Sequence, residues 1–240
     1  MKNRTLTQFF LMIIIVINVS GVLAQSIFYT GINCGKELDQ YGYAYKNGKH
    51  YLVWSNGSGR YYWGALYSNY DNYVKLSSST DGINWTTENI ISTTYGSYNL
   101  KIAIDNNNKI HIAYTQPTQI DYLPYGSNAA DVVYLTDKSG SWDKQTVVGT
   151  YGYYQFYASD LITIGPDEKI SVFYHSDHWW GYGSPLLVKK FNGTNWENEI
   201  TVANYGILNN CDDRSNILKG YDIENNQLVL YVSNGHYYNT

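Results

Sequence analysis

Apolar and polar residues alternate along this chain in short runs, and the runs recur at intervals of about sixty residues. Each recurrence has a polar turn that ends in lysine or glutamine, followed by a strand of aliphatic and aromatic residues. Four segments follow this template: 49–54, 109–114, 169–174 and 227–232. The three complete copies each end in a short turn that closes on tryptophan, at Trp85, Trp142 and Trp196. A period of this length indicates one structural unit copied along the chain.

Each repeat contains four short strands. In the second copy they are expected at 100–104, 110–114, 131–136 and 142–148. Alternating apolar residues, many of them β-branched or aromatic, are typical of an all-β protein. Four antiparallel strands in a repeating unit describe a β-propeller blade, with a sandwich or a solenoid as the alternative. The sequence therefore predicts an all-β propeller of four-stranded antiparallel blades, three of them full and one partial, at about 40–91, 99–148, 160–202 and 216–240.

Three segments resemble a known group of repeats: the turn 79–85, the strand pair 102–114 and the turn 139–142. They are similar to the BNR or Asp-box repeats of secreted, bacterial, sialidase-type propellers. One departure is that Asp81 and Gly82 are adjacent where the common form spaces them. The resemblance covers roughly residues 40–240 and implies a propeller whose Asp-box turn is structural. Such propellers include sialidases, polysaccharide lyases, lectins and scaffolds, so the resemblance implies no single function.

The number of repeats is smaller than a closed ring requires. Propellers have about 4–8 blades, and only the first two strands of a fourth blade are found before Thr240. Residues 26–29 offer one further outer strand. Either the sequence is a piece of a longer protein, or copies associate to complete the ring. An uncovered edge on the last blade favours self-association by strand pairing.

Residues 1–24 have the pattern of a signal peptide. Lys2 and Arg4 precede the apolar stretch 9–19, and the small-residue pattern 22–24 provides a cleavage site before Gln25. The apolar stretch is short for a membrane span, although an uncleaved anchor is the alternative. We therefore expect the propeller to occupy residues 25–240, to be secreted or held at the cell surface, and not to insert into a membrane after cleavage.

Charge excludes several partners. Without Lys2 and Arg4 the chain has 14 basic residues against 20 acidic ones, a net charge of −6. Arg60 and Arg214 are then its only arginines. Nucleic acid and anionic lipid are therefore not expected as partners. Two cysteines, Cys34 and Cys211, form either one disulfide or two separate buried thiols.

Aromatic residues concentrate in the long loops at one end of the blades. These loops hold 21 of the 40 aromatic residues within 84 positions, whereas the short turns at the other end hold none. Aromatic planes beside hydroxyl-binding side chains suit sugars, so we predict a glycan or cell-surface polysaccharide as partner. The alternative is that these aromatics pack the loops on their own blades. The predicted stacking residues are Tyr61, Tyr62, Trp63, His175, Trp179, Trp180 and Tyr182, with Asp160 and Asp177 as acceptors for sugar hydroxyls.

Four Asx residues precede the first strand of each repeat: Asp39, Asn99, Asp160 and Asn216. In a propeller these strands surround the central channel. The four side chains either bind a ligand or hard cation at its mouth, or cap local turns.

The sequence assigns no catalytic residue. The sialidase chemistry that the resemblance implies needs three arginines, and only two are present after cleavage. Paired carboxylates for a glycoside hydrolase, or a histidine or tyrosine base for a polysaccharide lyase, are available in the loops but not singled out by spacing. His175, Asp177 and His178 form at most half a metal site, so no metal and no cofactor are predicted. His50 and His111 are interpreted as core or edge residues. The main prediction is a lectin-like propeller, with a lyase or glycosidase as alternative and an adhesive scaffold as third.

Overall fold

Every element in the described part of the chain is a β-strand. The computed structural model describes residues 12–16, 24–28, 41–55, 73–93, 96–119, 129–149, 156–177, 185–203, 218–224 and 227–232. Within these residues, no helix has the length and apolar character needed to span a bilayer. Cys34 and Cys211 lie outside the described residues, so their pairing stays a prediction.

The strands form successive antiparallel sheets in chain order. The first blade has β3 (Tyr41–Lys46), β4 (Lys49–Ser55), β5 (Tyr73–Ser79) and β6 (Thr86–Ser92). The second has β7 (Tyr98–Ile104), β8 (Ile110–Gln119), β9 (Ala129–Thr136) and β10 (Asp143–Val148). The third has β11 (Phe156–Ile164), β12 (Ile170–Asp177), β13 (Leu186–Phe191) and β14 (Ile200–Ala203). β15 (Leu218–Glu224) and β16 (Gln227–Val232) form the hairpin of a fourth.

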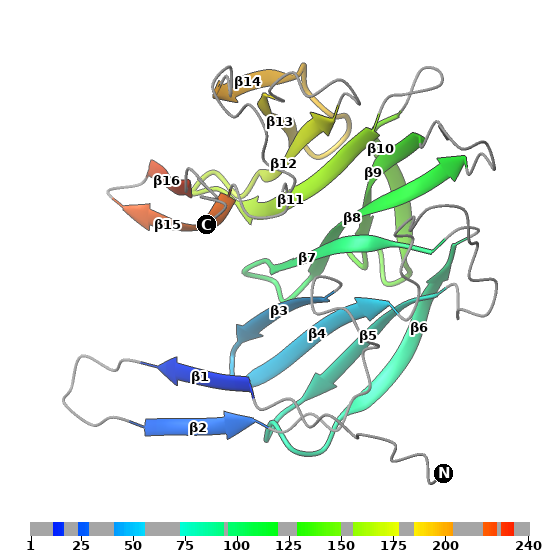
Figure 1. The fold of residues 1–240 in the computed structure, drawn as a ribbon. Coiled ribbons are helices and arrows are strands. Elements are labelled where there is room, and N and C mark those ends of the chain that lie inside the picture. Colours follow the sequence, from blue (N-terminus) through cyan, green and yellow to red (C-terminus); the bar gives the residue numbers. More distant parts are fainter. Residues whose placement is uncertain are drawn as a thin grey trace, which may run out of the picture.

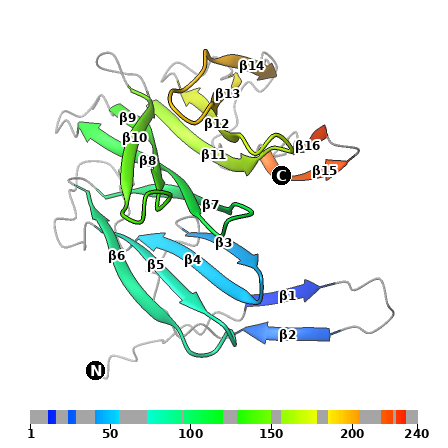
Figure 2. The ribbon, with the colours of Figure 1, turned by 180° about the vertical axis from the view of Figure 1, so that it is seen from behind.

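The blades share an inner edge made of their first strands. β3 lies against β7, β7 against β11, and β11 against β15. Figures 1 and 2 show the sheets fanning outward from these strands, with β6, β10 and β14 on the outside. A single parallel bridge between Phe156 and Ala130 joins the second and third blades. The prediction of a propeller with three full blades and part of a fourth is confirmed.

Two details differ from the sequence prediction. The outer strand of the second blade begins at Asp143 instead of the expected Trp142. In the first blade Trp85 closes its turn as expected, and its Nε1 donates to the carbonyl of Gly82 at 3.1 Å. Residues 26–29 do not complete the fourth blade: β2 (Ala24–Phe28) pairs instead with β1 (Met12–Val16). Cleavage of residues 1–24 stays a prediction.

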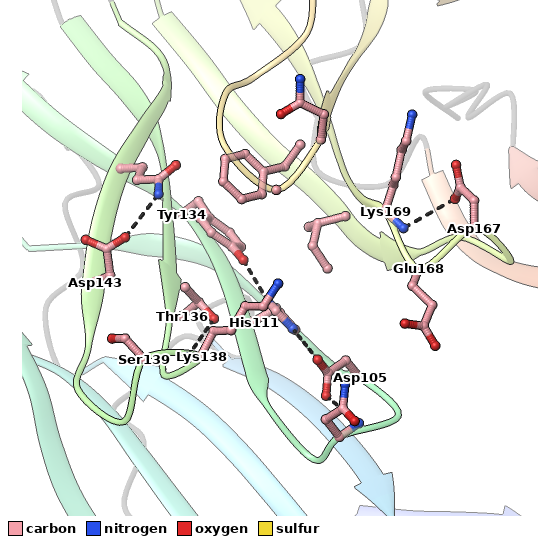
Figure 3. A pocket seen from close by; sticks show the side chains of 16 residues that line it. Asp105, His111, Tyr134, Thr136, Lys138, Ser139, Asp143, Asp167, Glu168 and Lys169 are labelled. Atoms are coloured by element: carbon pink, nitrogen blue, oxygen red, sulfur yellow. Dashed lines mark hydrogen bonds and ion pairs between the residues drawn. The ribbon is translucent and has the colours of Figure 1, made fainter.

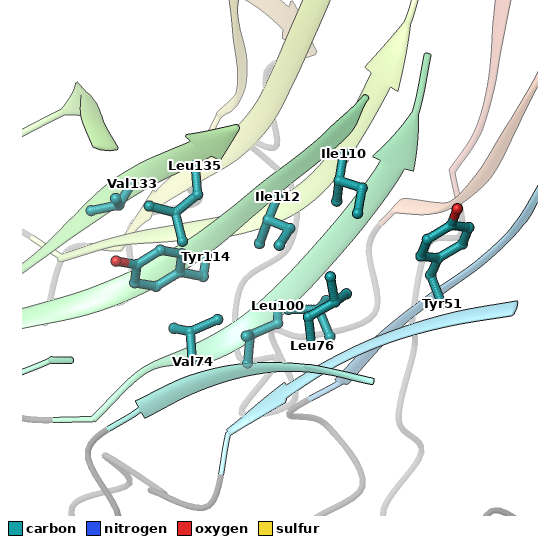
Figure 4. Close-up of a cluster of buried hydrophobic side chains, with 10 residues drawn as sticks. Tyr51, Val74, Leu76, Leu100, Ile110, Ile112, Tyr114, Val133 and Leu135 are labelled. Carbon is teal, nitrogen blue, oxygen red and sulfur yellow. The ribbon is translucent and has the colours of Figure 1, made fainter. Parts of the chain in front are cut away.

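Apolar side chains fill the space between blades. Because neighbouring residues of a strand point to opposite faces, the central strands of the second blade, β8 and β9, each contribute to two clusters. Ile110, Ile112 and Tyr114 of β8 belong to the cluster between the first and second blades, whereas Ala113 faces the third. Figure 4 shows the first cluster, in which Tyr114 points toward Val74. The second blade is therefore buried on both faces, which fixes its register.

Polar contacts link the hairpins of the inner strands. Asn47 Nδ2 donates to Asn108 Oδ1 at 2.7 Å, which joins the first blade to the second. Asn106 Nδ2 donates to Glu168 Oε1 at 3.2 Å and joins the second blade to the third. Asn47, Asn108 and Glu168 also share a left-handed backbone, with φ of 51°, 61° and 58°. The hairpins are therefore repeats of one another in conformation as well as in sequence.

The turn 79–85 is closed by the carboxylate of Asp81. Its Oδ1 accepts the N–H groups of Ile83 at 2.9 Å and Asn84 at 2.8 Å, and the Ser79 hydroxyl at 2.8 Å. These hydrogen bonds, above all that from the Asn84 N–H, hold the pKa of Asp81 well below its ordinary value of 3.8. Asp81 thus has a structural role in the turn, while the identity of the turn as an Asp-box motif stays a prediction.

Replacing Gly42 tests the close approach of the first two blades. A Cβ at this position of β3 would lie 2.9 Å from the Leu100 carbonyl oxygen and 3.0 Å from Lys101 Cα, both backbone atoms of β7. We expect Gly42→Ala to lower the free energy of unfolding by about 1–3 kcal/mol, because the strands must separate. Gly149→Ala is the matched control, since its Cβ would meet its nearest atom at an ordinary 3.6 Å. Equal stability of the two variants in urea would contradict this packing.

Replacing Asp81 tests the charge of its turn. A depressed folded-state pKa contributes stability above the unfolded value, and this contribution is lost as the pH falls toward the folded value. We expect Asp81→Asn to have a lower melting temperature than the native chain at neutral pH, with a gap that narrows below about pH 3.8. If the difference in melting temperature between the two proteins stays constant down to acid pH, the negative charge of Asp81 contributes nothing to stability.

Candidate functional site

The two ends of the blades differ in what the structure describes. Short hairpins form one end, here called the turn end; the other, here called the loop end, is the end at which β4, β8 and β12 finish and β5, β9 and β13 begin. Six of the nine predicted ligand-binding residues lie outside the described residues: Tyr61, Tyr62, Trp63, Trp179, Trp180 and Tyr182. Asp177 ends β12, and only its backbone is described. Asp160 and His175 are described in full.

Asp160 and His175 form a buried pair at the loop end. Asp160 Oδ2 lies 2.8 Å from His175 Nδ1, and the two side chains are 6% and 4% exposed. A bulge in β11 creates the contact: Ser159 pairs with Tyr174 and Leu161 with Phe173, so Asp160 is the extra residue. Bulges redirect side chains in this way and occur often beside functional sites. Sequence reasoning selected these two residues separately, and the structure brings them together.

The pair sets the chemistry of the imidazole. A carboxylate beside Nδ1 favours the tautomer in which Nδ1 carries the proton, which leaves Nε2 as the basic nitrogen. An imidazole oriented by a carboxylate is the arrangement that general acid–base catalysis uses. The same contact also satisfies a carboxylate that would otherwise be buried without a partner. The geometry is therefore suited to proton transfer, and it also stabilises the fold.

His175 replaces a small hydroxyl residue of the other blades. Ser55 in β4 and Thr115 in β8 occupy the equivalent position, and both are buried. Thr115 Oγ1 accepts the N–H of Ser159 at 2.9 Å, which ties the second blade to the inner strand of the third. His175 therefore stands where the third blade would contact its successor. An alignment of the repeats shows this replacement, and that signal was not used in the sequence prediction.

The expected ring of Asx residues is described at two positions. Asn99 lies at the bulge of β7 with a positive φ of 52°, and Asp160 lies at the bulge of β11. Asp39 and Asn216 lie outside the described residues. Among the side chains that are described, no group of three histidine, cysteine, aspartate or glutamate residues is arranged to hold a metal ion.

A cleft at the turn end was not predicted. It has a volume of about 500 Å³ and lies between the second and third blades, as Figure 3 shows. His111 lines it, and its Nδ1 lies 2.7 Å from the hydroxyl of Tyr134. Burial lowers the pKa of His111 below its ordinary 6.5, against the opposite effect of Asp105, so the ring is neutral at neutral pH. The interpretation of His111 as a core residue agrees with this contact, and Nε2 on the other side of the ring faces the Asp105 carboxylate at 3.5 Å.

Comparisons with known proteins assign no family. No protein-family model matches the chain, and no curated protein does. Among solved structures, a thermostable family-43 glycoside hydrolase is 12% identical over 69% of this chain and 53% of its own, with a TM-score of 0.46. The Bacillus subtilis arabinanase Arb43A is 13% identical over 75% and 60%, with a TM-score of 0.43. A family PL25 ulvan lyase is 10% identical over 70% and 59%, with a TM-score of 0.34. The chain thus spans between half and three fifths of the length of these structures.

Proposed function

We propose that this propeller acts on a polysaccharide at its loop end, with Asp160 and His175 as the proton-transfer pair. The observation that carries the proposal is the 2.8 Å contact between a buried carboxylate on β11 and a buried imidazole on β12, the first two strands of the third blade. Asp160 orients the ring, and His175 Nε2 acts as the general base. In a polysaccharide lyase it would take the proton from the carbon next to a uronate carboxyl while the glycosidic C–O bond breaks, a C=C bond forms and the leaving oxygen takes a proton from water. In a glycoside hydrolase it would take a proton from the attacking water, and a separate carboxyl group would protonate the leaving oxygen.

The loop residues supply the binding part of this proposal. Tyr61, Tyr62 and Trp63 precede β5, and Trp179, Trp180 and Tyr182 follow β12, so both groups belong to segments of the loop end. Aromatic rings stack on the C–H faces of sugars, while the carboxylate of Asp177 accepts hydrogen bonds from sugar hydroxyl groups. Binding without chemistry is the second candidate function, favoured by the aromatic content of these loops. Secretion, and association of copies through the fourth blade, belong to the same proposal.

The test measures whether the protein cleaves polysaccharides, binds them, or does both. Purified protein is incubated with a panel of neutral and uronate-containing polysaccharides, and new reducing ends and unsaturated ends are measured. We expect release by the native chain and a loss of about 100-fold or more in His175→Ala, since a positioned acid or base contributes about 10²–10⁴-fold. Asp160→Asn is expected to lower the rate and to displace its pH profile, because it removes the charge that orients the ring.

Controls separate chemistry from folding and binding. Glu88→Gln changes an exposed carboxylate of β6, on the outer edge of the first blade, and is expected to leave the rate unchanged. Thermal unfolding of each variant shows whether it is folded. If a polysaccharide is retained in affinity electrophoresis but no new sugar ends are released, the enzymatic proposal is overturned in favour of binding. In that case we expect the double variant Trp179→Ala plus Trp180→Ala to lose the retention. If the protein neither cleaves nor retains any of these polysaccharides, both the enzymatic proposal and the binding proposal are overturned.

A further inference from the structure

One hydrogen bond from the second blade reaches the residue that precedes Asp160. The hydroxyl oxygen of Thr115 in β8 accepts the backbone N–H of Ser159 in β11 at 2.9 Å. Both residues are buried, with exposed fractions of 0% for Thr115 and 1% for Ser159. A buried backbone N–H without an acceptor is costly, so this hydrogen bond is kept in the folded chain. A side chain of one blade thus holds the backbone of the next.

The bulge in β11 decides how close the Asp160 carboxylate comes to His175. Asp160 is the extra residue of the bulge and lies between the rows of Tyr174 and Phe173. In a regular ladder it would stand opposite Phe173, diagonal to His175, and diagonal neighbours are about 7–8 Å apart. Bulges bend a strand and redirect its side chains. The 2.8 Å contact between Asp160 Oδ2 and His175 Nδ1 therefore depends on where the bulge holds Asp160.

The sheet alone leaves the bulge weakly fixed. The extra residue of a bulge is unpaired and the ladder is locally disrupted. After the bulge, the pairing of β11 with β12 resumes at Leu161. Before it, β11 is tied to the second blade twice: by the bridge between Phe156 and Ala130, and by the hydrogen bond from Ser159 to Thr115. The second of these is the nearer to Asp160, because it acts on the adjacent residue.

We infer that Thr115 is a positioning residue, whose hydroxyl oxygen holds the N–H of Ser159 and so keeps the bulge in the geometry that brings Asp160 to His175. Thr115 acts through the backbone of β11 and needs no contact with a polysaccharide. Its consequence for catalysis rests on the proposed function of Asp160 and His175. Its effect on the contact between these two side chains can be measured without any substrate.

Three variants separate the hydroxyl of Thr115 from its bulk. Thr115→Val removes the acceptor of the Ser159 N–H and keeps a branched side chain of similar shape. Thr115→Ser keeps the hydroxyl and removes the methyl group. The matched control is Thr163→Val: Thr163 of β11 is also 0% exposed, but its Oγ1 has no hydrogen-bond partner among the residues that the structure describes. Thermal unfolding shows which variants are folded.

The measurement is the NMR signal of the proton on His175 Nδ1, which a hydrogen bond to a carboxylate moves to low field. We expect Thr115→Val to displace or abolish this signal, and Thr115→Ser and Thr163→Val to keep it as in the native chain. A loss of stability alone does not move the signal of a folded protein. With a polysaccharide that the native chain cleaves, we expect Thr115→Val to lower kcat about tenfold or more with little change in KM, because a small misplacement of a catalytic group is costly.

The positioning role is overturned if folded Thr115→Val keeps the native His175 signal. It is also overturned if Thr115→Ser or Thr163→Val displaces the signal as much as Thr115→Val does. If Thr115→Val does not fold, hydrogen exchange of the Ser159 amide in the native chain decides together with Thr115→Ser. Slow exchange with a native His175 signal in Thr115→Ser supports the role, and fast exchange overturns it.

Failure of the proposed function gives a different result. If the native chain releases no sugar ends but Thr115→Val still displaces the His175 signal, the enzymatic proposal fails and the positioning role of Thr115 stands. If the native chain cleaves a polysaccharide and Thr115→Val cleaves it at the native rate with an unchanged His175 signal, the positioning role fails and the enzymatic proposal stands.

Discussion

The burial of the second blade on both faces is the constraint on which the rest of the structure depends. Ile112 packs toward the first blade and Ala113 toward the third, and both are inaccessible to solvent. A slip of one residue would exchange these faces and place aliphatic side chains where the adjacent sheet leaves no room. Because the register is fixed, the inner strands meet at one edge, and distant parts of the chain converge at each end.

Much of the fold could be predicted because its signals are local. The polar turn before Lys109 and the alternation that follows it locate β7 and β8 without knowledge of the other blades. The bulge at Asp160 leaves no such signal, since it depends on pairing with β12. The start of the outer strand in the second blade was placed one residue too early, at Trp142 instead of Asp143, because the end of a turn is a property of the folded hairpin.

The candidate sites were harder to predict because both depend on distances between strands. Asp160 and His175 were selected from loop chemistry, yet their contact requires a bulge and a strand pairing that spacing alone does not give. The turn-end cleft lies between two blades, and periodicity contains no measure of the gap between them. His111 looks like a core residue in sequence, and its contacts with Tyr134 and Asp105 follow from the pairing and the hairpin geometry of the folded blade.

The two ends use the same repeat differently. At the loop end, His175 replaces the small hydroxyl residues of the other blades and is satisfied by a carboxylate of its own blade. At the turn end, His50 of β4 and His111 of β8 each contact a tyrosine hydroxyl through Nδ1, but among the described residues only His111 borders the cleft. Divergence at single positions of a repeat has thus produced two chemically distinct environments on one scaffold.

The shared inner edge is tested most directly by cross-linking the inner hairpins. Asn47 and Asn108 are exposed and in contact although they are 61 positions apart. In a chain with Cys34 and Cys211 replaced by serine, Asn47→Cys with Asn108→Cys is predicted to give an efficient intrachain product with a short bis-maleimide. The pair Asn47→Cys with Ser139→Cys, whose second position lies in an outer turn, is predicted to give little. Equal yields from the two pairs, or more product from the outer one, would contradict the radial arrangement of the blades.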